Sequence, residues 1–74
     1  MSLGERVRAM RLAKGYGPTE LASLAKVSRS ALYLLETGKQ ARPRAKTTRR
    51  LAEGLGVPLA ELLGIEPPLE RIAS

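Results

Sequence analysis

The chain has no cysteine and no histidine among its 74 residues. It therefore has no disulfide, no thiol nucleophile and neither of the side chains that usually bind zinc, so it must fold through packing alone. A chain of this length buries only about 60% of its unfolded surface, which favours one small domain of well-packed helices or one supported by a partner chain. No apolar run approaches the ~20 residues of a membrane span, and the N-terminus lacks the apolar core of a signal peptide. We therefore expect a cytoplasmic protein.

Recognisable catalytic arrangements are missing too. All seven acidic residues are glutamates, and none is paired with a base or nucleophile at a spacing typical of an active site. Ser28 and Ser30 have no histidine partner, and no glycine-rich loop follows a strand. The glutamates, apart from Glu36, are more simply explained as solvated helix faces. The sequence predicts no catalysis, no cofactor and no metal.

Positive charge is concentrated in one segment. The net charge is +6, and six of the 13 basic residues lie between positions 39 and 50, where no acidic residue occurs. In the rest of the chain, seven basic residues balance seven acidic ones. Such a cluster favours phosphates through counterion release, but it also suits acidic membranes or acidic proteins, and a basic run by itself is most often a solvated surface. An assignment to nucleic acid needs a second signal.

Apolar residues recur every three or four positions, with glycines 15, 38, 56 and 64 after four of the periodic segments. This pattern predicts helices over about residues 3–14, 18–25, 27–36, 45–55 and 59–63. Their inward positions are predicted to be Leu3, Val7, Met10, Leu21, Ala22, Ala25, Ala31, Leu32, Leu35, Thr48, Leu51, Ala52 and Leu55. No β-alternation competes with this all-α prediction. Pro67 and Pro68 end the pattern, leaving 65–74 as a tail that either supports a dimer or leads to a further region.

The helix predicted over residues 27–36 is the most informative about function. Ser28 can cap it, and only Lys26 and Val27 separate it from the helix before, so the two must cross steeply as a helix-turn-helix. Steps of 100° per residue put Ala31, Leu32 and Leu35 on one side and Arg29, Ser30, Tyr33 and Leu34 on the other. The first side can pack in a core while the second lies in a groove of duplex DNA.

Seven short motifs occur in a specific order and spacing. They are Leu21-Ala22, Val27-Ser28-Arg29-Ser30, Leu32, Leu35-Glu36-x-Gly38-Lys39, Leu51-Ala52, Leu55-Gly56-Val57 and Glu61-Leu62-Leu63. Together they resemble the Cro/phage-repressor type of DNA-binding domain, also called the xenobiotic-response-element family. The resemblance implies a five-helix, lambda-repressor-like domain over residues 1–64 with a central helix-turn-helix. It also implies a homodimer on a palindromic operator, with the third helix in the major groove.

The resemblance assigns roles residue by residue. Base edges would be contacted by Arg29, Ser30, Tyr33 and Leu34. A bidentate contact from Arg29 to guanine would be worth ~1–3 kcal/mol of discrimination, and Leu34 could pack on a thymine methyl. The DNA backbone would be contacted by Thr19, Ser28, Lys39, Gln40, Arg42, Arg44 and Lys46. Arg11 and Glu36 match a partly buried ion pair that joins the first helix to the third.

Three features depart from the family pattern. Pro18 stands where the family commonly has a glutamine that contacts a phosphate. Lys26 replaces the usual turn glycine, at a cost of roughly 1 kcal/mol if its backbone is left-handed. The loop over residues 38–43 is about one residue longer than usual.

Several leucines have more than one explanation. Leu12 and Leu24 stand where relatives are usually polar and are best explained as isolated surface leucines. Leu24 and Leu34 could alternatively form an apolar patch for a protein partner. Candidates for a dimer interface are Pro58, Leu59, Leu62, Leu69 and Ile72, with core packing the simpler role for Leu62.

Two functions fit these observations. The first is a sequence-specific DNA-binding transcription regulator: a small repressor, a controller protein or an antitoxin. The alternative is a protein-interaction module that binds an acidic partner through the exposed leucines and the loop that carries Lys39, Arg42 and Arg44, which we call the basic loop. We favour DNA because Arg29 and Ser30 lie at the groove-facing end of the helix and the basic loop follows directly.

Overall fold

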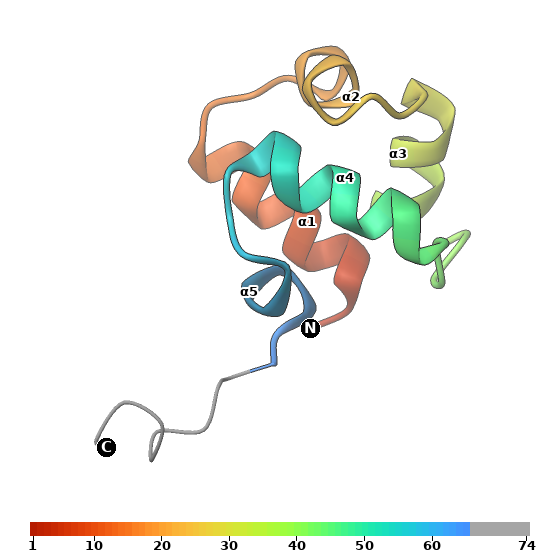
Figure 1. Ribbon diagram of the computed structural model, residues 1–74. Coiled ribbons are helices and arrows are strands. Elements are labelled where there is room, and N and C mark those ends of the chain that lie inside the picture. The colour runs from red at the N-terminus through yellow and green to blue at the C-terminus, as the bar shows by residue number, and fades with distance from the viewer. Residues whose placement is uncertain (66–74) are drawn as a thin grey trace.

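The computed structural model describes residues 1–65, which contain five helices joined by short loops (Figure 1). They are α1 (Leu3–Ala13), α2 (Pro18–Ala25), α3 (Arg29–Glu36), α4 (Ala45–Leu55) and α5 (Leu59–Leu63). Helix α4 packs against α1, α2 and α5, and α1 packs against α3 as well. Helix α5 lies on the side of the bundle away from α2 and α3 (Figure 1). The predicted all-α architecture and the order of the helices are confirmed.

Local side-chain chemistry explains where two of the helices begin. The Ser2 hydroxyl accepts a hydrogen bond from the Glu5 amide at 3.1 Å, and the Ser2 amide donates to the Glu5 carboxylate at 2.8 Å. This reciprocal capping box, which also lowers the pKa of Glu5 through the Ser2 hydrogen bonds, was not predicted. At α3, the Ser28 hydroxyl accepts from the Ala31 amide at 3.0 Å, as predicted.

The helix ends also follow the sequence. The four predicted glycines, at positions 15, 38, 56 and 64, all have positive φ angles. Lys26 ends α2 with φ 58° and ψ 41°, so a residue with a Cβ occupies the left-handed region there. Its strain is the cost of the short turn that brings α3 across α2.

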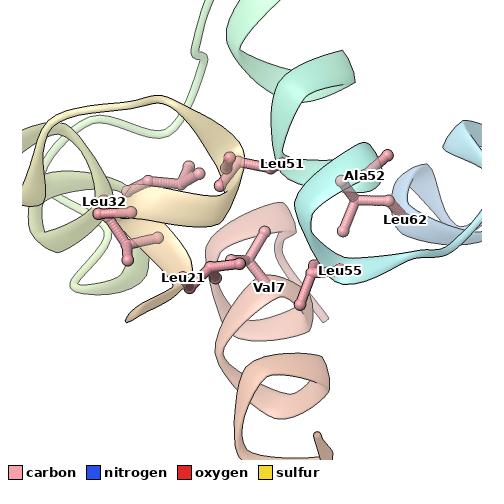
Figure 2. Packing of buried hydrophobic residues seen from close by; sticks show 10 residues of the cluster. Val7, Leu21, Leu32, Leu51, Ala52, Leu55 and Leu62 are labelled. Atoms are coloured by element: carbon pink, nitrogen blue, oxygen red, sulfur yellow. The ribbon is translucent and has the colours of Figure 1, made fainter. Parts of the chain in front are cut away.

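The core contains ten buried apolar side chains, and all five helices contribute to it (Figure 2). These are Val7, Leu21, Ala22, Ala25, Leu32, Leu35, Leu51, Ala52, Leu55 and Leu62. Leu3 and Met10 are only partly buried against this cluster. Leu62 is fully buried, so it has the simpler of its two predicted roles, core packing; this corrects its place among the dimer-interface candidates. Leu69 and Ile72, also assigned to that interface, lie outside the described residues.

Two glycines inside helices let backbones approach closely. A Cβ on Gly4 of α1 would overlap the carbonyl oxygen of Leu35 in α3. A Cβ on Gly54 of α4 would lie 2.9 Å from the Cα atom of Ala25 in α2. The neighbouring atoms are backbone, which cannot move aside without shifting a helix, so the sequence positions α2 and α3 partly by omitting side chains.

We predict that Gly54→Ala lowers the free energy of unfolding by about 1–3 kcal/mol, since the added methyl must push α2 away from α4. Urea unfolding followed by circular dichroism measures this change. Ser23→Ala, at an exposed position of α2, is the control and should stay within about 0.5 kcal/mol of wild type. Equal stability of the two variants would show that this contact does not restrain α2.

Candidate nucleic-acid interface

Helix α3 separates a core side from a solvent side. Leu32 and Leu35 are buried, whereas Arg29, Ser30 and Tyr33 are exposed, with Tyr33 at 57%. Leu34 is partly buried, and Ala31 is only partly buried on the core side. The predicted base-contacting residues Arg29, Ser30, Tyr33 and Leu34 together line one shallow depression. We call these four residues the outer face of α3.

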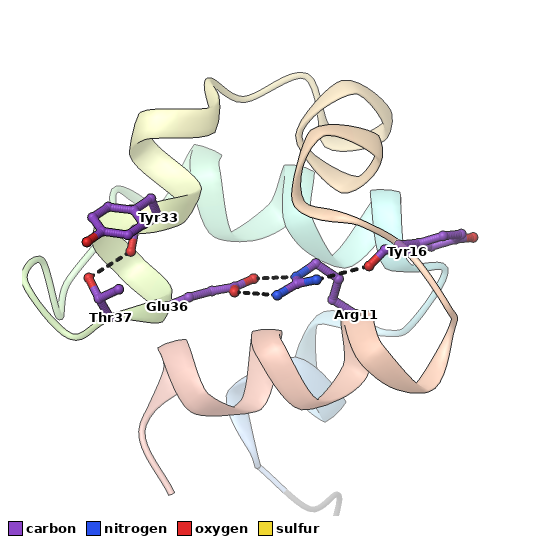
Figure 3. A network of polar contacts seen from close by, with 5 residues as sticks. All are labelled: Arg11, Tyr16, Tyr33, Glu36 and Thr37. Atoms are coloured by element: carbon purple, nitrogen blue, oxygen red, sulfur yellow. Dashed lines mark hydrogen bonds and ion pairs between the residues drawn. The ribbon is translucent and has the colours of Figure 1, made fainter.

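An ion pair fixes α3 against α1. Arg11 donates from Nε and Nη2 to the two carboxylate oxygens of Glu36, both at 2.9 Å, and its Nη1 donates to the Tyr16 carbonyl at 3.0 Å (Figure 3). The side chains of Arg11 and Glu36 are only 8% and 10% exposed. Hydrogen bonding to Glu36 raises the pKa of Arg11, so the guanidinium stays charged. The predicted pair is confirmed, while its third contact, to a backbone carbonyl, had no signal in the sequence.

The loop after α3 folds back along the helix. The Thr37 hydroxyl donates to the Tyr33 carbonyl at 2.8 Å (Figure 3), and the backbone N–H of Gln40 donates to the Leu34 carbonyl at 3.0 Å. The Lys39 ammonium lies 5.7 Å from the centre of the Tyr33 ring, within the range of a cation–π contact. The start of the basic segment is thereby held next to the outer face of α3.

The side chains predicted to contact the DNA backbone are accessible. Thr19, Ser28, Lys39, Gln40, Arg42, Arg44 and Lys46 are all exposed. Within residues 1–65, the ion pair of Arg11 and Glu36 is the one salt bridge, so the basic loop has no acidic partner there. Ser28 uses its oxygen to cap α3, which leaves its hydroxyl proton available as a donor.

The exposed apolar residues lie in other places. Leu12 and Leu24 are exposed, and Leu24 does not line the depression that holds Leu34. Pro58 and Leu59 are exposed at the start of α5. Sequence reasoning missed Leu63 and Ile65, which are exposed at its end. None of the described helices has both the length and the apolar character needed to cross a bilayer.

The chain belongs to the helix-turn-helix domain family, whose model matches residues 2–63. It is similar to the HTH-type transcriptional repressor RghR of Bacillus subtilis (strain 168), with 34% identity over 62 residues. That alignment covers 84% of this chain and 46% of RghR, so the chain spans about half the length of this relative. The family predicted from the motifs is confirmed as a helix-turn-helix domain.

We predict that Glu36→Gln lowers the free energy of unfolding by about 3–5 kcal/mol, because it leaves the Arg11 cation largely buried beside a neutral amide. Chemical denaturation is the measurement. Glu53→Gln removes the same charge at an exposed position and should change stability by less than about 0.5 kcal/mol.

A double variant, Arg11→Met with Glu36→Leu, provides a second control. It removes both charges together, so it should be more stable than Glu36→Gln. If Glu36→Gln is as mild as Glu53→Gln, the ion pair is not what holds α3 on α1.

Proposed function

We propose that this chain is a sequence-specific DNA-binding transcription regulator of the repressor type. The observation that carries the proposal is the exposed outer face of α3, which lies beside an exposed basic loop with no acidic partner among the described residues. An α-helix fits the major groove of B-DNA, and a cationic segment beside it would face the phosphates. Membership of the helix-turn-helix family and the similarity to a transcriptional repressor support this function.

In this proposal the outer face of α3 selects the DNA sequence. Arg29 and Ser30 lie in the first turn of α3, the part of such a helix that contacts base edges. The Arg29 guanidinium would bind the O6 and N7 atoms of guanine, and Leu34 would pack on a thymine methyl. Tyr33, held beside Lys39, would contact a phosphate or a base at the edge of the groove.

In this proposal affinity comes from the basic loop, the first turn of α4 and the starts of α2 and α3. Lys39, Gln40, Arg42, Arg44 and Lys46, together with Thr19 and Ser28, would bind phosphates on either side of the groove. Such contacts fix the register of the protein on the duplex but do not discriminate between bases. We also propose that the chain acts in the cytoplasm, where the DNA of a bacterium lies, since the similar repressor RghR is bacterial.

We further propose that two copies bind a palindromic operator. One module of this size buries little surface on DNA, so tight specific binding calls for two modules on half-sites about one helical turn apart. The exposed apolar residues of the last helical segment, Pro58, Leu59, Leu63 and Ile65, suit a contact between the copies. Sedimentation of the complex with a selected operator should give two chains per duplex, and one chain per duplex would contradict the dimer.

We predict that binding to a duplex weakens steeply as salt rises from about 50 to 200 mM, because each neutralised phosphate contributes about −0.9 to the slope of log K against log salt. Fluorescence anisotropy with a labelled duplex measures this slope. The operator itself can be isolated by selection from random duplexes. Absent or salt-insensitive binding would contradict the proposal and favour a protein partner.

We predict that Arg29→Ala and Arg42→Ala differ in kind. Arg29→Ala should lose preference at one operator position, with a change of ~1–3 kcal/mol between bases there. Arg42→Ala should weaken binding to all duplexes alike and reduce the salt slope by about 1. Competition between the operator and its single-base variants measures both effects. If the two substitutions behave alike, the division between base contacts and backbone contacts is wrong.

A further inference from the structure

A cavity of about 280 Å³ lies where α1, the start of α2 and α3 meet. Its lining includes Arg8 from α1, Pro18 from α2, and Arg29 and Tyr33 from the outer face of α3. The ion pair of Arg11 and Glu36 also borders it. The cavity therefore adjoins the proposed DNA-contacting surface, yet Arg8 was not among the residues predicted to contact DNA.

The lining carries positive charge that no neighbouring acid balances. The Glu36 carboxylate accepts both of its hydrogen bonds from Arg11, so it is already engaged. Arg8 and Arg29 are exposed, and neither forms a salt bridge with any described residue. Two guanidinium groups on one small cavity favour an anion, and a guanidinium can hold two oxygens of a phosphate at once.

The start of α2 also favours an anion in the cavity, although it supplies no positively charged side chain. Pro18 is the first residue of the helix, and Gly17 before it provides no side-chain cap. The positive end of the α2 dipole therefore lies at the wall of the cavity. Proline has no N–H and no polar side chain, so Pro18 itself offers an anion no hydrogen bond at this corner of the cavity. Arg8 of α1 lines the same cavity and carries a guanidinium group, which can donate hydrogen bonds to an anion.

We propose that this cavity receives a phosphodiester of the DNA backbone and that Arg8 of α1 is its principal ligand. The inference rests on the proposed DNA-binding function and extends it to a helix that sequence reasoning left out of the interface. Arg8 contributes affinity here, while Arg29, which lines the same cavity and adds to its positive charge, would contact the bases. The role thus extends the anchoring of the protein from the basic loop to α1.

The first experiment measures salt-dependent binding of the full chain and Arg8→Ala to the operator and to an unrelated duplex. Loss of one phosphate contact should reduce the salt slope by about 1 and weaken both complexes by about tenfold. Lys14→Ala is the matched control: it removes one exposed positive charge just after α1, and Lys14 does not line the cavity. Arg8→Lys should recover part of the affinity because it keeps the charge but loses the bidentate geometry.

The second experiment identifies the phosphate. Operators that carry one neutral methylphosphonate linkage, moved a position at a time, are titrated with wild type and with Arg8→Ala. At the linkage that Arg8 contacts, the neutral group should weaken wild type by about tenfold and leave Arg8→Ala nearly unchanged. Such non-additivity reports a direct contact, which general loss of charge or stability would not produce.

Three outcomes would overturn the inference. Equal effects of Arg8→Ala and Lys14→Ala would show that only net charge matters. Additive effects at every linkage would show that Arg8 contacts no phosphate. A site on Arg8 that is saturated by inorganic phosphate in NMR titrations, together with additive linkage effects, would assign the cavity to a free anion. Because all three are read on a wild-type protein that binds DNA, they differ from failure of the proposed function, in which wild type itself does not bind.

Discussion

The hydrogen bonds between Arg11 and Glu36 are the interaction on which the rest of the structure depends. Helix α3 has eight residues and buries only Leu32 and Leu35, too little for an isolated helix to hold its place. The bidentate pair fixes its last turn to α1, and the third hydrogen bond of Arg11 fixes the segment that leads into α2. One buried cation thus joins the elements that present the outer face of α3. Charge pairs are suited to this task because their geometry is directional, whereas apolar contacts tolerate sliding.

Much of the fold could be predicted from the sequence because its signals are local. Apolar spacing, glycines with positive φ and the Ser28 cap each involve residues within one turn of the helix that they define. The Ser2 capping box has an equally local signal, serine followed three residues later by Glu5, and it could have been found. The motif resemblance predicted the ion pair, which joins residues 25 positions apart.

Other features required the three-dimensional structure. Nothing near Gly54 in the sequence indicates that Ala25 lies against it, and the carbonyl of Tyr16 has no sequence signal as an acceptor. The position of Arg8 beside Arg29 depends on how α1 crosses α3. Leu62 and Leu59 occupy the same short helix, and the sequence favoured core packing for Leu62 but left the role of Leu59 open. The structure answers that question by burial.

The arrangement of charge explains how one small domain can separate affinity from specificity. Groups that would bind phosphates come from the loop after α3, from the start of α2 and from α1, so they are separate from the outer face of α3. In the proposed complex, backbone contacts at several separated points would restrict the angle at which α3 enters the groove. With the angle restricted, a few short side chains such as Ser30 would be able to discriminate bases, because their distance from the base edges would vary little. Rigidity is therefore needed most in the contacts that hold α3, which are the close approach of Gly4 to Leu35 and the buried ion pair of Arg11 and Glu36.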